Sequence, residues 1–247
     1  MKVVYVFSGK GGVGKSTVCV NLAFAFHMLG FKTALFDADI SGPSIPTLVK
    51  GLEESKPRID GVSVLPGIYG GIAINSLGFI CEPTDGSFWI GKYLQGALFQ
   101  LAFSVPWDAE VLLVDLPPGV SDIHQELFTK MPGKILIVTT PQRVAFSDIL
   151  RSVDFVKRLN IETLGVVENM SYYECEECGH RKRIFTSDTQ SGLCDPLGVN
   201  MLAELPIIPE INELSDVGIP FVCNYPHSSP AEVYKNLAGT IWEQYDL

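Results

Sequence analysis

One Gly-rich segment, residues 8–17, constrains the fold more than any other part of the sequence: it reads Ser-Gly-Lys-Gly-Gly-Val-Gly-Lys-Ser-Thr. Four residues fit the pattern G-x-x-x-x-G-K-S/T: Gly9, Gly14, Lys15 and Ser16. The apolar run Val3 to Phe7 precedes the segment, and the amphipathic stretch 18–29 follows it. A Gly-rich turn between a strand and a helix is the context that a phosphate-binding loop requires.

The residue types in this loop suit a nucleotide. Glycines let backbone N–H groups converge on phosphate oxygens, and the following helix N-terminus adds partial positive charge. We expect Lys15 to reach the β- and γ-phosphates and Ser16 to ligate Mg²⁺. The predicted ATP contacts come from consecutive or nearby loop residues: Gly9, Gly11, Gly12, Val13, Gly14, Lys15, Ser16 and Thr17.

A second lysine, Lys10, directly follows the first glycine of the pattern. The form GKGGVGKST resembles the deviant Walker A motif of the MinD/ParA/ArsA class of ATPases, in which the extra lysine reaches the nucleotide of the partner subunit. The resemblance implies a nucleotide-dependent homodimer. The alternative is a solvated loop lysine, because lysine is usually exposed.

Length and charge narrow the class of protein. The 247 residues contain no linker-like or low-complexity stretch, so we expect a single P-loop ATPase domain over residues 1–247. The formal net charge of −10 argues against nucleic acid or an anionic membrane as a partner. No apolar stretch approaches the length of a membrane span, and we expect a cytoplasmic protein.

Two aspartates lie at or just after the end of the next apolar strand, residues 32–37. Asp37 ends that strand and Asp39 comes two positions later. Ligands bind at the carboxyl ends of strands in open α/β sheets, so both carboxylates should lie beside the phosphate loop. We predict that Asp39 orients the attacking water and that Asp37 belongs to the Mg²⁺ shell. Loop aspartates that cap a turn are the alternative.

A further apolar strand, Val111-Leu-Leu-Val-Asp115, also ends in a carboxylate. This is the Walker B arrangement, in which Asp115 would bind Mg²⁺ directly or through water. Gly119 lies shortly after it, and the segment 117–122 is a candidate switch that contacts the γ-phosphate.

The remaining pattern sets the fold class. Apolar strands at 134–140 and 164–167 are separated by a helical segment, 145–159, which predicts right-handed crossovers and a parallel sheet. We expect a three-layer α/β P-loop NTPase fold, with a mostly parallel central sheet flanked by helices. Alternating residues in 62–65 and 71–76 suggest one antiparallel hairpin at the sheet edge.

Asn169 follows the last of these strands. We predict that its amide hydrogen-bonds the adenine edge, and a turn-forming Asn is the alternative.

The segment 171–187 contains a CxxC pair, Cys175 and Cys178, followed by Gly. Two thiols at this spacing can hold one metal, but tetrahedral zinc and a [4Fe-4S] cluster each need four ligands. Three completions are open: Cys194 with Cys223, His180, or the same CxxC of a second subunit across a two-fold axis. A redox dithiol or plain reduced thiols also stay open.

Six motifs occur in order along the chain: SGKGGVGKST, DADISGPSIP, VLLVDLPPG, VTTPQ, GVVENMSYYECEECG and SPAEVYKNLA. Together they resemble the Mrp/ApbC family of P-loop ATPases that carry iron-sulfur clusters, which are relatives of MinD. In that family a [4Fe-4S] cluster bridges two subunits. The resemblance implies that Cys175 and Cys178 are cluster ligands and that Lys10 acts across the dimer.

Two functions are therefore in competition. The first is an ATP-hydrolysing scaffold or carrier that holds a [4Fe-4S] cluster at a homodimer interface and transfers it to apo iron-sulfur proteins. The alternative is a MinD/ParA-like ATPase switch that acts on a macromolecular partner, with the CxxC as a structural zinc clamp.

Overall fold

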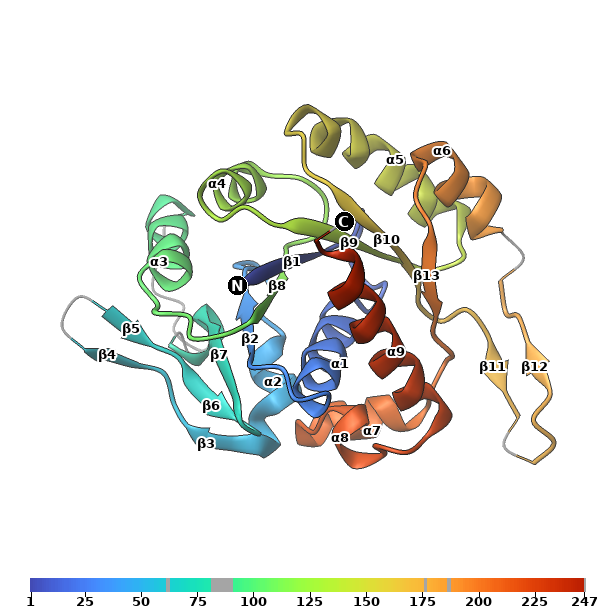
Figure 1. The fold of residues 1–247 in the computed structure, drawn as a ribbon, viewed down its shortest axis with the longest axis horizontal. Helices are drawn as coiled ribbons and strands as arrows, with labels where there is room; N and C mark the ends of the chain where they lie inside the picture. The colour runs from blue at the N-terminus through green and yellow to red at the C-terminus, as the bar shows by residue number, and fades with distance from the viewer. Residues whose placement is uncertain (61–62, 81–90, 176, 186–187, 247) are drawn as a thin grey trace.

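The structure is a computed structural model, and it describes residues 1–60, 63–80, 91–175, 177–185 and 188–246. A nine-stranded sheet runs through this described part (Figure 1). In spatial order its strands are β13 (Met201–Glu204), β10 (Thr163–Glu168), β9 (Lys134–Thr139), β1 (Lys2–Phe7), β8 (Val111–Asp115), β2 (Thr33–Asp37), β7 (Ile72–Ser76), β6 (Gly67–Tyr69) and β3 (Glu53–Ser55). Neighbours from β13 to β7 are parallel, and β6 and β3 add antiparallel pairs at one edge.

Helices cover both faces of the sheet (Figure 1). One face carries α1 (Lys15–Met28), α2 (Ile45–Val49), α7 (Glu210–Val217), α8 (Phe221–Asn224) and α9 (Ser229–Gln244). The other carries α3 (Gly91–Phe103), α4 (Asp122–Lys130), α5 (Arg143–Arg158) and α6 (Asp195–Leu197). Short helical turns occur at η1 (Lys50–Leu52), η2 (Leu77–Phe79) and η3 (Gln190–Cys194). Two apolar cores result, one on each face, which confirms the predicted three-layer α/β fold.

Burial on both faces explains the sequence of the central strands. All five residues of β8 are buried, and its apolar run is continuous because helices cover it on both sides. Within the described residues, no helix is both long enough and apolar enough to cross a bilayer.

The sheet topology brings the predicted site residues to one edge. The phosphate loop follows β1, Asp115 ends β8, and Asp37 ends β2, where it is the register partner of Asp115. Asn169 directly follows β10. The candidate nucleotide residues therefore meet at the carboxyl ends of parallel strands.

Two small hairpins lie outside the large sheet. The strands β11 (Tyr173–Glu174) and β12 (Arg181–Lys182) pair antiparallel and carry the CxxC on the loop between them (Figure 1). The strands β4 (Arg58–Asp60) and β5 (Ser63–Leu65) form the other.

The predicted pairing of 62–65 with 71–76 is wrong. β5 pairs with β4, whereas β7 pairs antiparallel with β6 and parallel with β2. The turn between β6 and β7 is Gly70–Gly71, with φ angles of 55° and 79°. Positive φ at both central residues is what a tight two-residue hairpin needs, so this glycine pair is a hairpin turn rather than part of a longer gap.

Candidate functional site

The phosphate loop owes its shape to glycines with left-handed or closely packed backbones. Gly12 and Gly14 have φ angles of 81° and 79°. A Cβ on Gly14 would lie 2.3 Å from Nδ2 of Asn169, and a Cβ on Gly9 would lie 2.5 Å from the backbone N of Ile149 in α5. Gly14 is therefore required by conformation and contact, and Gly9 by the close approach of the loop to α5.

Gly14→Ala is expected to lower the free energy of unfolding of the nucleotide-free protein by at least about 2 kcal/mol, because it combines positive-φ strain with a clash against the Asn169 amide. Urea unfolding followed by circular dichroism measures this. Gly11→Ala is the matched control, because a Cβ on Gly11 would meet no described atom within 4 Å. We expect its unfolding free energy to stay within about 0.5 kcal/mol of the parent. Equal effects of the two substitutions would contradict the left-handed geometry at Gly14.

Lys15 and Asp115 form a buried ion pair beside this loop. Lys15 Nζ lies 2.6 Å from Asp115 Oδ1, and the two side chains are 7% and 0% exposed. The other carboxylate oxygen, Asp115 Oδ2, has no hydrogen-bond partner among the described residues. Ser16 Oγ lies 3.4 Å from Lys15 Nζ, so a hydroxyl and an unpaired carboxylate oxygen flank the lysine.

The charges at this edge favour a bound cation. Burial and, to a smaller extent, the neighbouring Asp115 raise the pKa of Asp37 to about 8. Burial also raises the pKa of Asp115, while Lys15 opposes the shift. Two buried carboxylates thus share one lysine. Ser16 and Asp115 fit Mg²⁺, since hydroxyl and carboxylate oxygens are its usual protein ligands.

Asp37 and Asp39 hold the loop that follows β2. Asp37 accepts hydrogen bonds from the backbone N of Asp39 at 3.1 Å, the backbone N of Ile45 at 3.3 Å and Ser76 Oγ at 3.0 Å. Asp39 Oδ1 accepts from the backbone N of Ser41 and Gly42 at 3.1 and 3.2 Å. Asp39 therefore caps a turn, and it also lines the cavity at the phosphate loop.

That cavity has a volume of about 270 Å³. Besides Lys10, its lining includes six of the predicted nucleotide residues of the phosphate loop, Gly11, Gly12, Gly14, Lys15, Ser16 and Thr17, but neither Gly9 nor Val13. Most of the loop, including Gly14, Lys15 and Ser16 of the sequence pattern, thus borders one open space, which suits a phosphate chain.

Lys10 and Asn169 contact other parts of this edge. Lys10 Nζ donates to Gln142 Oε1 of the same chain at 3.1 Å. Asn169 Nδ2 donates to the carbonyl oxygen of Val13 at 2.9 Å, and the Asn169 backbone N donates to Thr139 O at 2.7 Å. Asn169 therefore supports the phosphate loop directly. Its contact with adenine, and the reach of Lys10 across a dimer, stay predictions.

His124, on the first turn of α4, was not identified from the sequence. It is buried, its ring lies edge-on to Phe7, and its Nδ1 accepts a hydrogen bond from the backbone N of Ser121 at 3.1 Å. Ser121 and His124 form a capping box that fixes the segment after Gly119, whose own N donates to Ser8 O at 2.9 Å. The only available signal was a serine three residues before a polar side chain, in the position where a capping box usually has Glu or Gln.

Burial lowers the pKa of His124 to about 4. The unfolded chain therefore binds more protons between about pH 6.5 and pH 4, so this residue makes stability fall as the pH falls through that window. His124→Gln keeps a capping-box acceptor and removes the titration. We expect the loss of unfolding free energy between pH 7 and pH 4.5 to shrink by on the order of 2 kcal/mol, measured by denaturant titration at each pH. An unchanged pH dependence would contradict the burial of a neutral imidazole.

The CxxC hairpin places both cysteines at its turn. The backbone N of Cys175 donates to His180 O at 3.0 Å, and Gly179 N donates to Cys175 O at 2.8 Å. Gly179 has a φ of 67°, so the chain turns tightly after the second cysteine. Cys178 is exposed and Cys175 is half-buried. The two thiols are thus presented at the surface on one short loop.

The described residues do not complete a metal site within one chain. They contain no group of three or more Cys, His, Asp or Glu side chains placed to hold one metal ion. Cys194 and Cys223 do not form such a group with the CxxC, and burial raises their pKa values to about 11 and about 12. Of the three completions, the two within one chain are not formed by the residues described.

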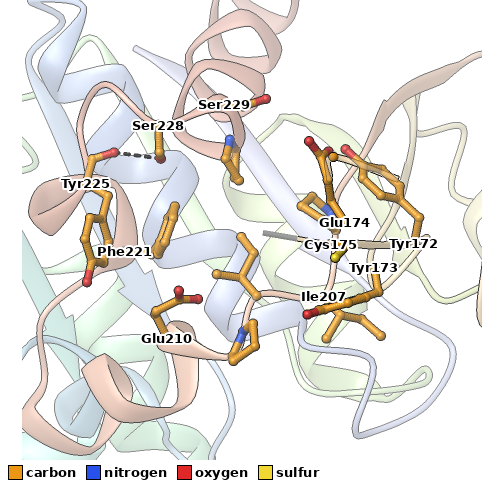
Figure 2. Close-up of a pocket in the computed structure, with 15 residues that line it drawn as sticks. Tyr172, Tyr173, Glu174, Cys175, Ile207, Glu210, Phe221, Tyr225, Ser228 and Ser229 are labelled. Carbon is orange, nitrogen blue, oxygen red and sulfur yellow. Dashed lines mark hydrogen bonds between the residues drawn. The ribbon is translucent and has the colours of Figure 1, made fainter. Parts of the chain in front are cut away.

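A cavity of about 330 Å³ adjoins the hairpin, and Cys175 lines it (Figure 2). The opposite wall comes from α8 and the N-terminal end of α9. Aromatic side chains from both sides line it: Tyr172, Tyr173, Phe221 and Tyr225. Cys175 therefore borders a hollow rather than the packed core.

Comparison with known proteins places this chain in a family. The profile of a family described as "ParA: NUBPL iron-transfer P-loop NTPase" matches residues 1–242. The "Iron-sulfur cluster carrier protein" of Haemophilus influenzae is 36% identical over 241 residues, which cover 97% of this chain and 65% of that protein. The chain thus spans about two thirds of the length of this curated relative.

Solved structures agree with the fold. A nucleotide-binding protein from Archaeoglobus fulgidus, in complex with ADP, is 32% identical with a TM-score of 0.73, over 88% of this chain and 86% of that one. The septum site-determining protein MinD from Pyrococcus horikoshii, complexed with Mg-ADP, is 20% identical with a TM-score of 0.67, over 97% and 95% of the two chains. The second likeness bears on the fold alone.

Proposed function

Because this chain belongs to the ParA family of NUBPL-type iron-transfer P-loop NTPases, we propose that it is an ATPase that carries a [4Fe-4S] cluster between two copies of itself and transfers it to apo-proteins. The observation that carries the proposal is the pairing of a formed phosphate loop with a two-thiol hairpin that lacks further ligands among the described residues of its own chain. The names of the curated relatives support the carrier role.

The nucleotide site supplies the ATPase part of the proposal. Backbone N–H groups of the phosphate loop and Lys15 would bind the phosphates, and Ser16 and Asp115 would hold Mg²⁺. The metal would add positive charge where the phosphoryl oxygens gain negative charge. Asp39, which lines the cavity, would orient the attacking water.

The hairpin supplies the cargo site. A [4Fe-4S] cluster takes four thiolates, and each chain offers Cys175 and Cys178 on one exposed turn. A two-fold axis through the cluster completes the set without any further residue type. Lys10 would then act on the nucleotide of the partner subunit.

A second candidate keeps the ATPase and replaces the cluster by zinc. Four cysteines from two chains are also the ligand set of a structural zinc site, and the fold is shared with MinD. In that case the protein would be a nucleotide switch on a macromolecular partner, with the CxxC as a dimer clamp.

Cluster transfer tests the proposed function. Protein reconstituted without oxygen is mixed with an apo-ferredoxin, and the acceptor is separated and examined for a [4Fe-4S] spectrum. We expect the acceptor to gain the cluster faster than it does from free iron and sulfide at the same concentration. Equal rates from the two sources would overturn the carrier role.

A further inference from the structure

The phosphate loop and the CxxC hairpin are attached to neighbouring residues at the end of β10. Glu168 is the last residue of this strand, and Asn169 follows it. Asn169 Nδ2 donates to Val13 O in the phosphate loop at 2.9 Å. The short segment from Ser171 to Glu174 then leads into Cys175.

Glu168 binds both ends of the hairpin. Its side chain is 1% exposed, and its two carboxylate oxygens accept hydrogen bonds from the hydroxyls of Ser171 and Thr189. Arg183 Nη1 lies 3.3 Å from Oε1 of the same carboxylate. Ser171 precedes β11, Arg183 follows β12, and Thr189 begins the next helical segment. The buried Glu168 carboxylate therefore contacts both the segment that enters the hairpin and the segment that leaves it.

The base of the hairpin is also bonded to the edge of the sheet at β13. Arg183 Nη2 lies 2.6 Å from Glu204 Oε1 on β13, and Ser171 N donates to Leu205 O at 2.8 Å. A buried carboxylate with several donors, one of them charged, is costly to disrupt, because removing its charge weakens its ion pair with Arg183 and its hydrogen bonds from the two hydroxyls. The ATPase chemistry proposed above makes no use of Glu168.

We propose that Glu168 is a positioning residue that holds the CxxC hairpin in a fixed relation to the phosphate loop, so that nucleotide binding restrains the hairpin. Val13 and Asn169 provide the contact on the nucleotide side, and Ser171, Thr189 and Arg183 provide it on the hairpin side. The inference rests on the proposed nucleotide site and is independent of the metal that Cys175 and Cys178 bind.

Hydrogen exchange of the metal-free chain, with and without MgADP, tests this coupling. In the parent we expect MgADP to slow amide exchange in residues 173–183 by at least about fivefold, the lower end of usual coupling between sites. Glu168→Gln should bind MgADP with the parent's affinity by calorimetry and lose this slowing. Glu204→Gln is the matched control: it removes the other partner of Arg183, leaves Glu168 in place, and should keep the slowing.

Three results would overturn the proposal: no slowing in the parent hairpin, parent-like slowing in Glu168→Gln, or loss of MgADP binding in Glu168→Gln. If Glu168→Gln does not fold, Thr189→Val removes one donor to the same carboxylate and should reduce the slowing. If the parent protein binds no iron, the proposed cluster cargo is wrong, but the hydrogen-exchange result is unaffected. The two proposals can therefore be refuted independently.

Discussion

Lys15→Ala is expected to reduce ATP hydrolysis at saturating MgATP by at least about 100-fold, the usual effect of removing a buried donor aimed at developing charge. Lys15 is the cation paired with Asp115 at 2.6 Å, and it lines the cavity that the phosphate loop surrounds. Phosphate release by the purified protein measures the rate. Hydrolysis at the parent rate would show that this loop is not the ATPase site.

The control for this variant is Lys32→Ala, which removes an exposed lysine that pairs with Asp108 on the surface. We expect parent-like hydrolysis, because exposed ion pairs contribute little to stability and this lysine does not line the cavity at the phosphate loop. Because Lys15→Ala also leaves Asp115 without its cation, far-UV circular dichroism must show that the variant is folded.

Replacing both Cys175 and Cys178 by Ser is expected to remove essentially all iron bound after anaerobic reconstitution. A serine hydroxyl keeps its proton near neutral pH and is a poor iron ligand, whereas thiolates hold the cluster. Iron and sulfide assays, with the visible absorption of the cluster, measure the loss.

The matched controls are Cys194→Ala and Cys223→Ala. Neither thiol belongs to the hairpin, since Cys194 lies in η3 and Cys223 in α8, so we expect parent levels of iron. Parent levels in the double serine variant, or a loss confined to the Cys194 or Cys223 variants, would contradict the assignment of the CxxC.

Local patterns were sufficient to predict most of the fold. Apolar strands that end in Asp37 and Asp115, with a Gly-rich loop after the first strand, determined the parallel sheet and its ligand edge, and the family inferred from the motifs is confirmed. The predicted hairpin was wrong because the tight Gly70–Gly71 turn pairs β7 with the strand just before it, β6. The other edge of β7 then pairs with β2, a contact between segments far apart in sequence.

The contacts within the site could not be read from spacing. The pairing of Lys15 with Asp115, the support of Val13 by Asn169 and the burial of His124 all join residues far apart in sequence or depend on packing. In the sequence, Glu168 resembles an ordinary strand-end residue. Its role depends on donors from both sides of the hairpin, which only the folded chain brings together.

Metal analysis of protein purified and reconstituted without oxygen, combined with the mass of the assembly in solution, decides whether two chains share one cluster. We predict about four iron and four sulfide per two chains, in a dimer that dissociates or loses iron when Cys175 and Cys178 are replaced. Zinc at about one atom per two chains, with no iron taken up, would contradict the shared cluster and leave a zinc-clamped ATPase in its place.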